Sequence, residues 1–163
     1  MTVAVLDACV LVPSVLADTL LRCAEQELYR PLWTRAILDE VRRNLPPSVL
    51  GAKAERRVEV MREHFPTAMV SGYEPLIAEM TDDPKDRHVL AAAVAADAEV
   101  IVTANLRDFP DHALAPYAIE ALLPTTSSAC CWTTTRNESR TSSCSRRRPP
   151  GEVDGRSSVW TTS

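Results

Sequence analysis

The sequence predicts an α/β fold built around a parallel sheet of four to five strands. Two stretches, 3–6 and 99–102, are short, continuously apolar and rich in β-branched residues, as strands buried in a parallel sheet are. Elsewhere apolar residues recur at intervals of three and four, which is the period of an amphipathic helix. Strand-like and helix-like segments alternate along the chain, and this alternation indicates a parallel sheet.

Each further element has a local signal of its own. Thr34 precedes an apolar-periodic run that stops at two prolines, so it is predicted to be the N-cap of a helix over 34–45. Pro84 suits the first turn of a helix that runs to about Ala96, because no amide donor is missed there. The segment 113–123 fits either a short strand or a helix. The other predictions are strands at 29–33 and 68–70, helices at 15–27 and 47–65, and a helical turn at 75–80.

The composition is that of one soluble globular domain, with 163 residues of which 45% are apolar and 25% charged. No apolar run is long enough to span a bilayer, and the N-terminal residues lack the basic region of a signal peptide. We therefore expect a cytoplasmic protein with no membrane partner. The five cysteines show neither a CxxC spacing nor a zinc-like pairing with histidine, so free thiols are expected.

Charge is distributed unevenly along the chain. Residues 1–123 hold 12 Lys and Arg against 19 Asp and Glu, whereas residues 124–163 hold 6 against 3. An acidic body is unlike the basic footprint that most nucleic-acid-binding proteins have. It is the balance that a cluster of metal-binding carboxylates would produce.

Three acidic residues stand near strand ends or in a helix start. Asp7 directly follows the strand 3–6, and Asp108 comes soon after the strand 99–102, at the edge where parallel sheets form sites. Asp86 lies in the first turn of the helix before that strand, at the centre of its apolar face. Asp7 and Asp86 each have two interpretations: a turn or capping residue, or a carboxylate held for chemistry. The residues alone leave both open.

A fourth acid, Glu40, lies at the edge of the apolar face of the helix over 34–45. It could reach inward from the helix flank, and the simpler interpretation is a surface glutamate. If all four acids meet at one sheet edge, each pair 4 Å apart repels by about 4 kcal/mol at an effective dielectric of 20. Such a cluster needs protons or a cation, and an all-carboxylate set suits Mg²⁺ or Mn²⁺.

Four segments, in this order and spacing, carry a family resemblance: LDACVLVP at 6–13, AILDEVRRNL at 36–45, DPKDRHVLAAA at 83–93 and VTANLRDFP at 102–110. They resemble the PIN-domain ribonucleases, and most of all the toxins of VapC-type toxin–antitoxin pairs and their close bacterial relatives. The resemblance covers residues 3 to about 123. It implies a PIN-like three-layer α/β/α domain over 1–123.

The resemblance also implies an endoribonuclease whose metal ions, Mg²⁺ or Mn²⁺, activate water and stabilise charge on the scissile RNA phosphodiester. Thr103 and Asn105 match a position that orients the acids, and Asp83 is a candidate outer-shell ligand. A homodimer and a small antitoxin that wraps over the site are the expected partners. The residues that match the family's catalytic quartet are Asp7, Glu40, Asp86 and Asp108, of which Asp7, Asp86 and Asp108 are expected to bind metal.

Other polar residues near the acids have less specific signals. Arg87 and Arg107 are candidates for phosphate contacts, with a solvated flank as the alternative. His88 is expected to be a surface or packing histidine, and Cys9 a small core residue rather than a nucleophile. Two other functions stay open: a non-catalytic RNA- or partner-binding module of the same fold, and a DNA-directed nuclease or phosphatase-like enzyme that uses the same metals.

After Pro124 the composition changes to Ser, Thr and Arg, and hydrophobic periodicity ends. Residues 124–163 are therefore predicted to be a low-complexity basic tail outside the domain at 1–123. An alternative is a shift of the reading frame, since codons typical of a GC-rich gene would read over 125–135, in another frame, as leucines and aspartates. Such a shift would have replaced an amphipathic terminal helix.

Overall fold

The computed structural model describes residues 1–47 and 51–124. The predicted tail beyond Pro124, its alternative reading frame and the first turn of the helix predicted at 47–65 lie outside these residues. Within them, five parallel strands form one sheet in the order β3-β2-β1-β4-β5. The strands are β1 (Val3–Leu6), β2 (Arg30–Thr34), β3 (Met69–Val70), β4 (Val100–Val102) and β5 (Glu120–Leu122).

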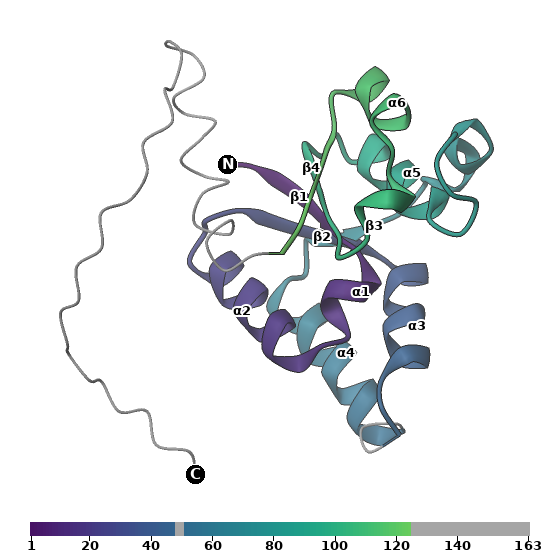
Figure 1. The fold of residues 1–163 in the computed structure, drawn as a ribbon. Coiled ribbons are helices and arrows are strands. Elements are labelled where there is room, and N and C mark those ends of the chain that lie inside the picture. The colour runs from purple at the N-terminus through teal and green to yellow at the C-terminus, as the bar shows by residue number, and fades with distance from the viewer. Residues whose placement is uncertain (48–50, 125–163) are drawn as a thin grey trace, which may run out of the picture.

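Helices cover both faces of this sheet, which confirms the predicted three-layer α/β/α architecture (Figure 1). One face carries α1 (Ala8–Leu11), α2 (Ser14–Glu25), α3 (Arg35–Asn44) and α4 (Ala52–His64). The other carries α5 (Arg87–Ala95), which packs on the 3₁₀ turn η1 (Glu74–Glu79). β4 is buried at every residue and β1 at every residue but its first, because both are flanked by strands and covered by helices.

The strand order explains why one edge of the sheet can hold a site. From β1 the chain moves outward to β2 and β3, and then returns to β4 on the other side of β1. Because β–α–β crossovers are right-handed, this reversal places α5 on the face opposite α2, α3 and α4. Open α/β sheets bind ligands where the order reverses, outside the carboxyl ends of the strands. Asp7 and Thr103 are the first residues after β1 and β4.

One predicted helix start is confirmed and one is wrong. Thr34 is the N-cap of α3, and its side chain accepts a hydrogen bond from the Ile37 amide at 3.1 Å. Pro84, in contrast, lies in a turn ahead of α5, which begins only at Arg87. In that turn the Lys85 amide donates to Asp83 Oδ1 at 3.0 Å. This side-chain turn gives the backbone an alternative to the first helical turn.

The short helix α1 was not predicted. α1 is a single buried turn whose residues are apolar on nearly every side, so its sequence shows no helical period. The undecided segment 113–123 contains both alternatives, since α6 (Asp111–Leu114) and η3 (Ala115–Tyr117) are followed by β5. Ala118, which lies between η3 and β5, has a left-handed backbone conformation with φ of 55°.

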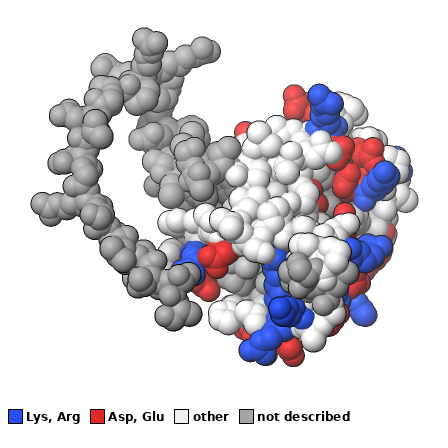
Figure 2. All heavy atoms as spheres, turned by 60° about the horizontal axis from the view of Figure 1, so that its bottom comes forward, with Lys and Arg blue, Asp and Glu red and all other residues white. Residues whose placement is uncertain are grey.

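The surface of the described residues carries charges of both signs. Figure 2 shows acidic and basic side chains intermixed on one face, with no continuous basic stripe. This distribution agrees with the acidic balance of residues 1–123. None of the helices in the described part of the chain has the length and apolar character needed to cross a bilayer.

Candidate acidic active site

Asp7 is the buried centre of the acidic site. Its backbone amide donates to the Val102 carbonyl at 3.0 Å, which ties the end of β1 to the end of β4. The Asp7 side chain is 6% exposed. Asp7 occupies the N-cap position of α1, yet its carboxylate makes no capping hydrogen bond. The capping interpretation therefore does not explain why this carboxylate is buried.

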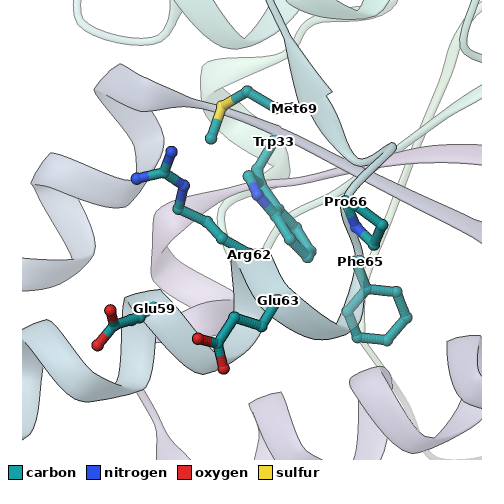
Figure 3. Close-up of a pocket in the computed structure, with 7 residues that line it drawn as sticks. All are labelled: Trp33, Glu59, Arg62, Glu63, Phe65, Pro66 and Met69. Atoms are coloured by element: carbon teal, nitrogen blue, oxygen red, sulfur yellow. The ribbon is translucent and has the colours of Figure 1, made fainter.

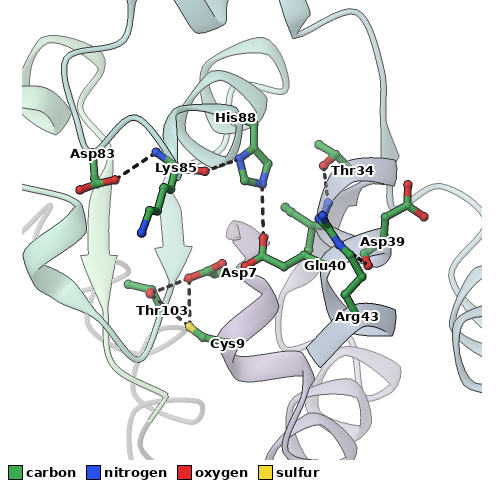
Figure 4. A network of polar contacts seen from close by, with 11 residues as sticks. Asp7, Cys9, Thr34, Asp39, Glu40, Arg43, Asp83, Lys85, His88 and Thr103 are labelled. Carbon is green, nitrogen blue, oxygen red and sulfur yellow. Dashed lines mark hydrogen bonds and ion pairs between the residues drawn. The ribbon is translucent and has the colours of Figure 1, made fainter. Parts of the chain in front are cut away.

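Two donors fix the orientation of the Asp7 carboxylate (Figure 4). The Thr103 hydroxyl donates to Oδ2 at 2.8 Å, and the Cys9 thiol donates to the same oxygen at 2.9 Å. Thr103 is itself fully buried, and its Oγ1 accepts a hydrogen bond from the Asn105 amide at 3.1 Å. Because both donors converge on Oδ2, the other oxygen, Oδ1, is the one available to a ligand.

Cys9 serves as a donor rather than as a nucleophile. Burial, together with the charge of Asp7, raises the pKa of the Cys9 thiol to about 12, so the sulfur keeps its proton near neutral pH. The Ala104 amide donates to Cys9 Sγ at 3.1 Å, which holds the thiol in place. The sequence indicated a small core residue here. It did not indicate the contact with Asp7, which depends on the turn of α1.

If the acids bind a divalent metal, Cys9→Ser should keep the affinity for it within about twofold, because a hydroxyl can donate to Asp7 Oδ2 in the same way. Cys9→Ala should weaken that affinity about tenfold, since a hydrogen bond to a charged group contributes about 1.5–3 kcal/mol. Calorimetric titration with MnCl₂ measures both. The control is Cys23→Ala, which removes the thiol of a cysteine on α2. Equal affinities for Cys9→Ala and wild type would show that the thiol does not orient Asp7.

Asp86 experiences the charges of the other acids. It is half-buried at the N-cap position of α5, where its side chain makes no capping hydrogen bond. Burial, the largest cause, and then the charges of the surrounding carboxylates raise the pKa of Asp86 to about 7. Carboxylates from three separate parts of the fold, and from the turn before α5, are therefore within electrostatic reach of Asp86. In order of effect, they are Asp7, Asp108, Asp83 and Glu40.

Glu40 approaches the site from α3, on the opposite side of the sheet edge from α5. Its Oε2 lies 3.9 Å from Nε2 of His88 on α5 (Figure 4). The neighbouring Asp39 instead pairs with Arg42 at 2.6 Å. The helix thus directs Glu40 toward the cluster and Asp39 along its outer face; the sequence allowed this direction for Glu40 but favoured a surface glutamate.

Asp108 and Asp83 lie side by side but are held by local hydrogen bonds. Asp108 is in the 3₁₀ turn η2 (Leu106–Asp108), and its Oδ2 accepts a hydrogen bond from Asn105 Nδ2. The Asp83 amide donates to the Asp108 carbonyl at 3.3 Å, so the two loops are joined. Asp83 Oδ1 is engaged by the Lys85 amide, as in a turn-capping aspartate.

The donor chemistry of this cluster fits a hard divalent cation, because Asp7, Glu40, Asp86 and Asp108 all offer carboxylate oxygens. Asp7 offers a fixed and buried carboxylate, and the pKa of Asp86 is raised by its burial and then by the negative charges around it. As the side chains stand, no three or more His, Cys, Asp or Glu residues of the described chain surround a point that could hold a metal ion. An ion would have to draw the carboxylates together.

The two candidate phosphate contacts differ in their surroundings. Arg87 is partly buried, and its Nε donates to the Asp82 carbonyl at 3.3 Å. Arg107 is exposed on η2.

Asp82, which the sequence did not single out, is 3% exposed, and its carboxylate has no hydrogen-bond partner among the described residues. Burial raises the pKa of Asp82, and the nearby Arg87 charge opposes that rise.

A cavity of about 430 Å³ lies away from this chemistry (Figure 3). None of the acids described above lines it. Trp33 of β2 forms one wall, and its ring meets Phe65 edge to face, with centroids 5.8 Å apart. The remaining lining residues come from α4, the segment after it and β3, and are Glu59, Arg62, Glu63, Pro66 and Met69.

The fold and the acidic edge define a class of α/β proteins with a carboxylate site where the strand order reverses. The sequence profile of the PIN domain family matches residues 3–107, and the chain belongs to this family. It is also similar to a Mycobacterium tuberculosis (strain ATCC 25618 / H37Rv) protein described as "Putative ribonuclease VapC50". The two are 64% identical over 58 residues, which are 36% of this chain and 34% of that protein, so the match spans about a third of the relative.

A solved structure is also similar to this chain. Its title is "Crystal structure of VapBC2 from Rickettsia felis bound to a DNA fragment from their promoter". The TM-score is 0.49 and the sequence identity 17%, over 74% of this chain and 99% of that chain.

Proposed function

We propose that this protein is an endoribonuclease that depends on Mg²⁺ or Mn²⁺ and acts as the toxin of a toxin–antitoxin pair. The observation that carries the proposal is the crowding of carboxylates around Asp86, whose pKa is raised to about 7 by burial and by four neighbouring acids. Membership of the PIN domain family and the description of the mycobacterial relative as a ribonuclease support it.

The proposed catalytic residues are the four acids at the sheet edge. Asp7, Asp86 and Asp108 would hold the metal, and Glu40 would complete the quartet from α3. A bound divalent ion would supply a Lewis acid and a more acidic water beside the scissile phosphodiester. Thr103 and Cys9 keep Asp7 oriented through Oδ2, and Asn105 holds Asp108. Arg107, exposed beside Asp108, is the better placed of the two arginines to contact a phosphate.

We also propose a cytoplasmic homodimer that a small antitoxin inhibits. These proposals rest on the resemblance of the four sequence segments to VapC-type toxins. A small reading frame next to the gene, and a protein that co-purifies with this chain at a fixed ratio, would support them. Without an antitoxin, light scattering of the purified chain measures whether it is a dimer.

The proposal predicts that the purified protein cleaves structured RNA when Mg²⁺ or Mn²⁺ is present and stops when EDTA is added. The assay should also include a single-stranded RNA, a single-stranded DNA of matching sequence and p-nitrophenyl phosphate. Carboxylate-bound metals do not by themselves select the substrate, so this panel is needed to identify it. Cleavage of RNA alone supports the proposal, and cleavage of DNA alone favours a DNA nuclease. RNA binding without cleavage in either metal would favour a non-catalytic module and contradict the proposal.

A further inference from the structure

His88 is held in an orientation that the acidic quartet does not explain. It lies on α5, two residues after Asp86, and its side chain is 18% exposed. Its Nδ1 is 2.9 Å from the Lys85 carbonyl. A carbonyl oxygen can only accept, so Nδ1 carries a hydrogen and donates it. In the neutral ring, Nε2 is therefore an acceptor with a free lone pair.

That lone pair faces another acceptor. His88 Nε2 is buried without a hydrogen-bond partner among the described residues, and Glu40 Oε2 lies 3.9 Å from it (Figure 4). A protonated ring would form an ion pair with Glu40 across this gap, whereas in the neutral ring two acceptors face each other. A divalent cation can accept electron pairs from both.

The backbone contact of His88 is the one that metal-binding histidines usually have. Such a histidine donates its second ring N–H to a carbonyl or a carboxylate, which fixes the tautomer and the orientation of the ring. His64 on α4 offers an internal comparison, because its Nδ1 also lies 2.9 Å from a backbone carbonyl, that of Val60. His64 is exposed, and within residues 1–47 and 51–124 no carboxylate is paired with its ring. Among the described residues, His88 alone combines this backbone contact with a facing acid.

We propose that His88 Nε2 and Glu40 are ligands of a divalent transition-metal ion at the α3–α5 side of the acidic site. This inference rests on the proposed metal-dependent function and specifies which metal the site selects. Mg²⁺ prefers oxygen ligands and retains much of its water, whereas Mn²⁺, Co²⁺ and Zn²⁺ accept an imidazole nitrogen readily. The protein should therefore prefer Mn²⁺ to Mg²⁺.

The test uses MnCl₂ as the probe and the full chain as it exists. Electron spin-echo modulation of bound Mn²⁺ detects a directly coordinated ¹⁴N, and calorimetry gives the affinities for MnCl₂ and MgCl₂. Wild type should show ¹⁴N modulation. His88→Gln should lose it and bind Mn²⁺ about tenfold or more weakly, with Mg²⁺ affinity changed less than about twofold. His64→Gln, the matched control, should behave as wild type.

The chain has three histidines, so a second variant keeps the test decisive if His88→Gln does not fold. His64→Gln combined with His112→Gln leaves His88 as the sole histidine, and the ¹⁴N modulation should persist. Mn²⁺ binding without ¹⁴N modulation, or modulation that survives His88→Gln, would overturn this inference and leave the proposed function intact. A wild-type protein that binds neither Mn²⁺ nor Mg²⁺ would overturn both.

Discussion

Asp7→Asn is expected to abolish metal-dependent cleavage of RNA while the protein remains folded. Loss of an outer-shell partner costs a metal site about 10–100-fold, so loss of a proposed ligand should lower Mn²⁺ affinity by at least about 100-fold. The amide has nearly the same shape, and its oxygen can still accept the hydrogen bonds from Thr103 and Cys9. Replacing a buried carboxylate by a neutral group should not lower the stability.

The control for this variant is Asp18→Asn. Asp18 is exposed on α2 and pairs with Arg22 at 2.7 Å, so the charge change is the same but lies away from the site. Calorimetry with MnCl₂ and a gel assay of RNA cleavage measure the two variants beside wild type. Cleavage by folded Asp7→Asn at more than about a tenth of the wild-type rate would show that Asp7 is not needed for the chemistry.

Asp86→Asn is expected to make the metal-free protein more stable at neutral and alkaline pH. The pKa of Asp86 rises from 3.8 to about 7 on folding, so between these pH values the folded state binds more protons than the unfolded state. The free energy of unfolding therefore falls as the pH rises from about 4 to 7. Asn carries no charge, and the Asp86 side chain makes no capping hydrogen bond that the variant could lose, so only the electrostatic penalty is removed.

The unfolding midpoint of Asp86→Asn should exceed that of wild type by an amount that increases between pH 4 and 7 and levels off above pH 7. Asp86 is half-buried, so the difference should be on the order of a few degrees. Asp82 changes the stability of both proteins in the same direction, and the comparison removes its effect. The control is Asp111→Asn, which removes a negative charge from α6. Parallel curves for wild type and Asp86→Asn across this range would contradict the crowding of charges.

Much of the fold followed from patterns that extend over several residues. The apolar runs 3–6 and 99–102 became β1 and β4, two paired inner strands of the sheet, and Thr34 capped α3 as its position before an apolar-periodic run predicted. The helical period of α3 placed Glu40 at the edge of the apolar face, but it left open whether the side chain would reach the cluster. These features depend on side-chain spacing, which a sequence records directly.

The features that the sequence did not predict depend on contacts between distant residues or on single turns. Cys9 and Thr103 meet at Asp7 because β1 and β4 are neighbours, although 94 residues separate them along the chain. Pro84 was expected in a helix, and the hydrogen bond from the Lys85 amide to Asp83 made a turn there instead. The position of His88 in the sequence of α5 gave no sign of a contact with an acid. Glu40 faces its ring because α3 approaches α5 in the fold.

The unfolding midpoints of wild type and Asp86→Asn at pH 8, with and without MnCl₂, test the central claim most directly. If carboxylates crowd at this edge and a divalent ion relieves their repulsion, the wild-type midpoint should rise with MnCl₂ concentration by mass action. Asp86→Asn should start higher without metal and gain much less. A wild-type midpoint that does not respond to MnCl₂, together with an Asp86→Asn midpoint no higher than wild type, would contradict the account.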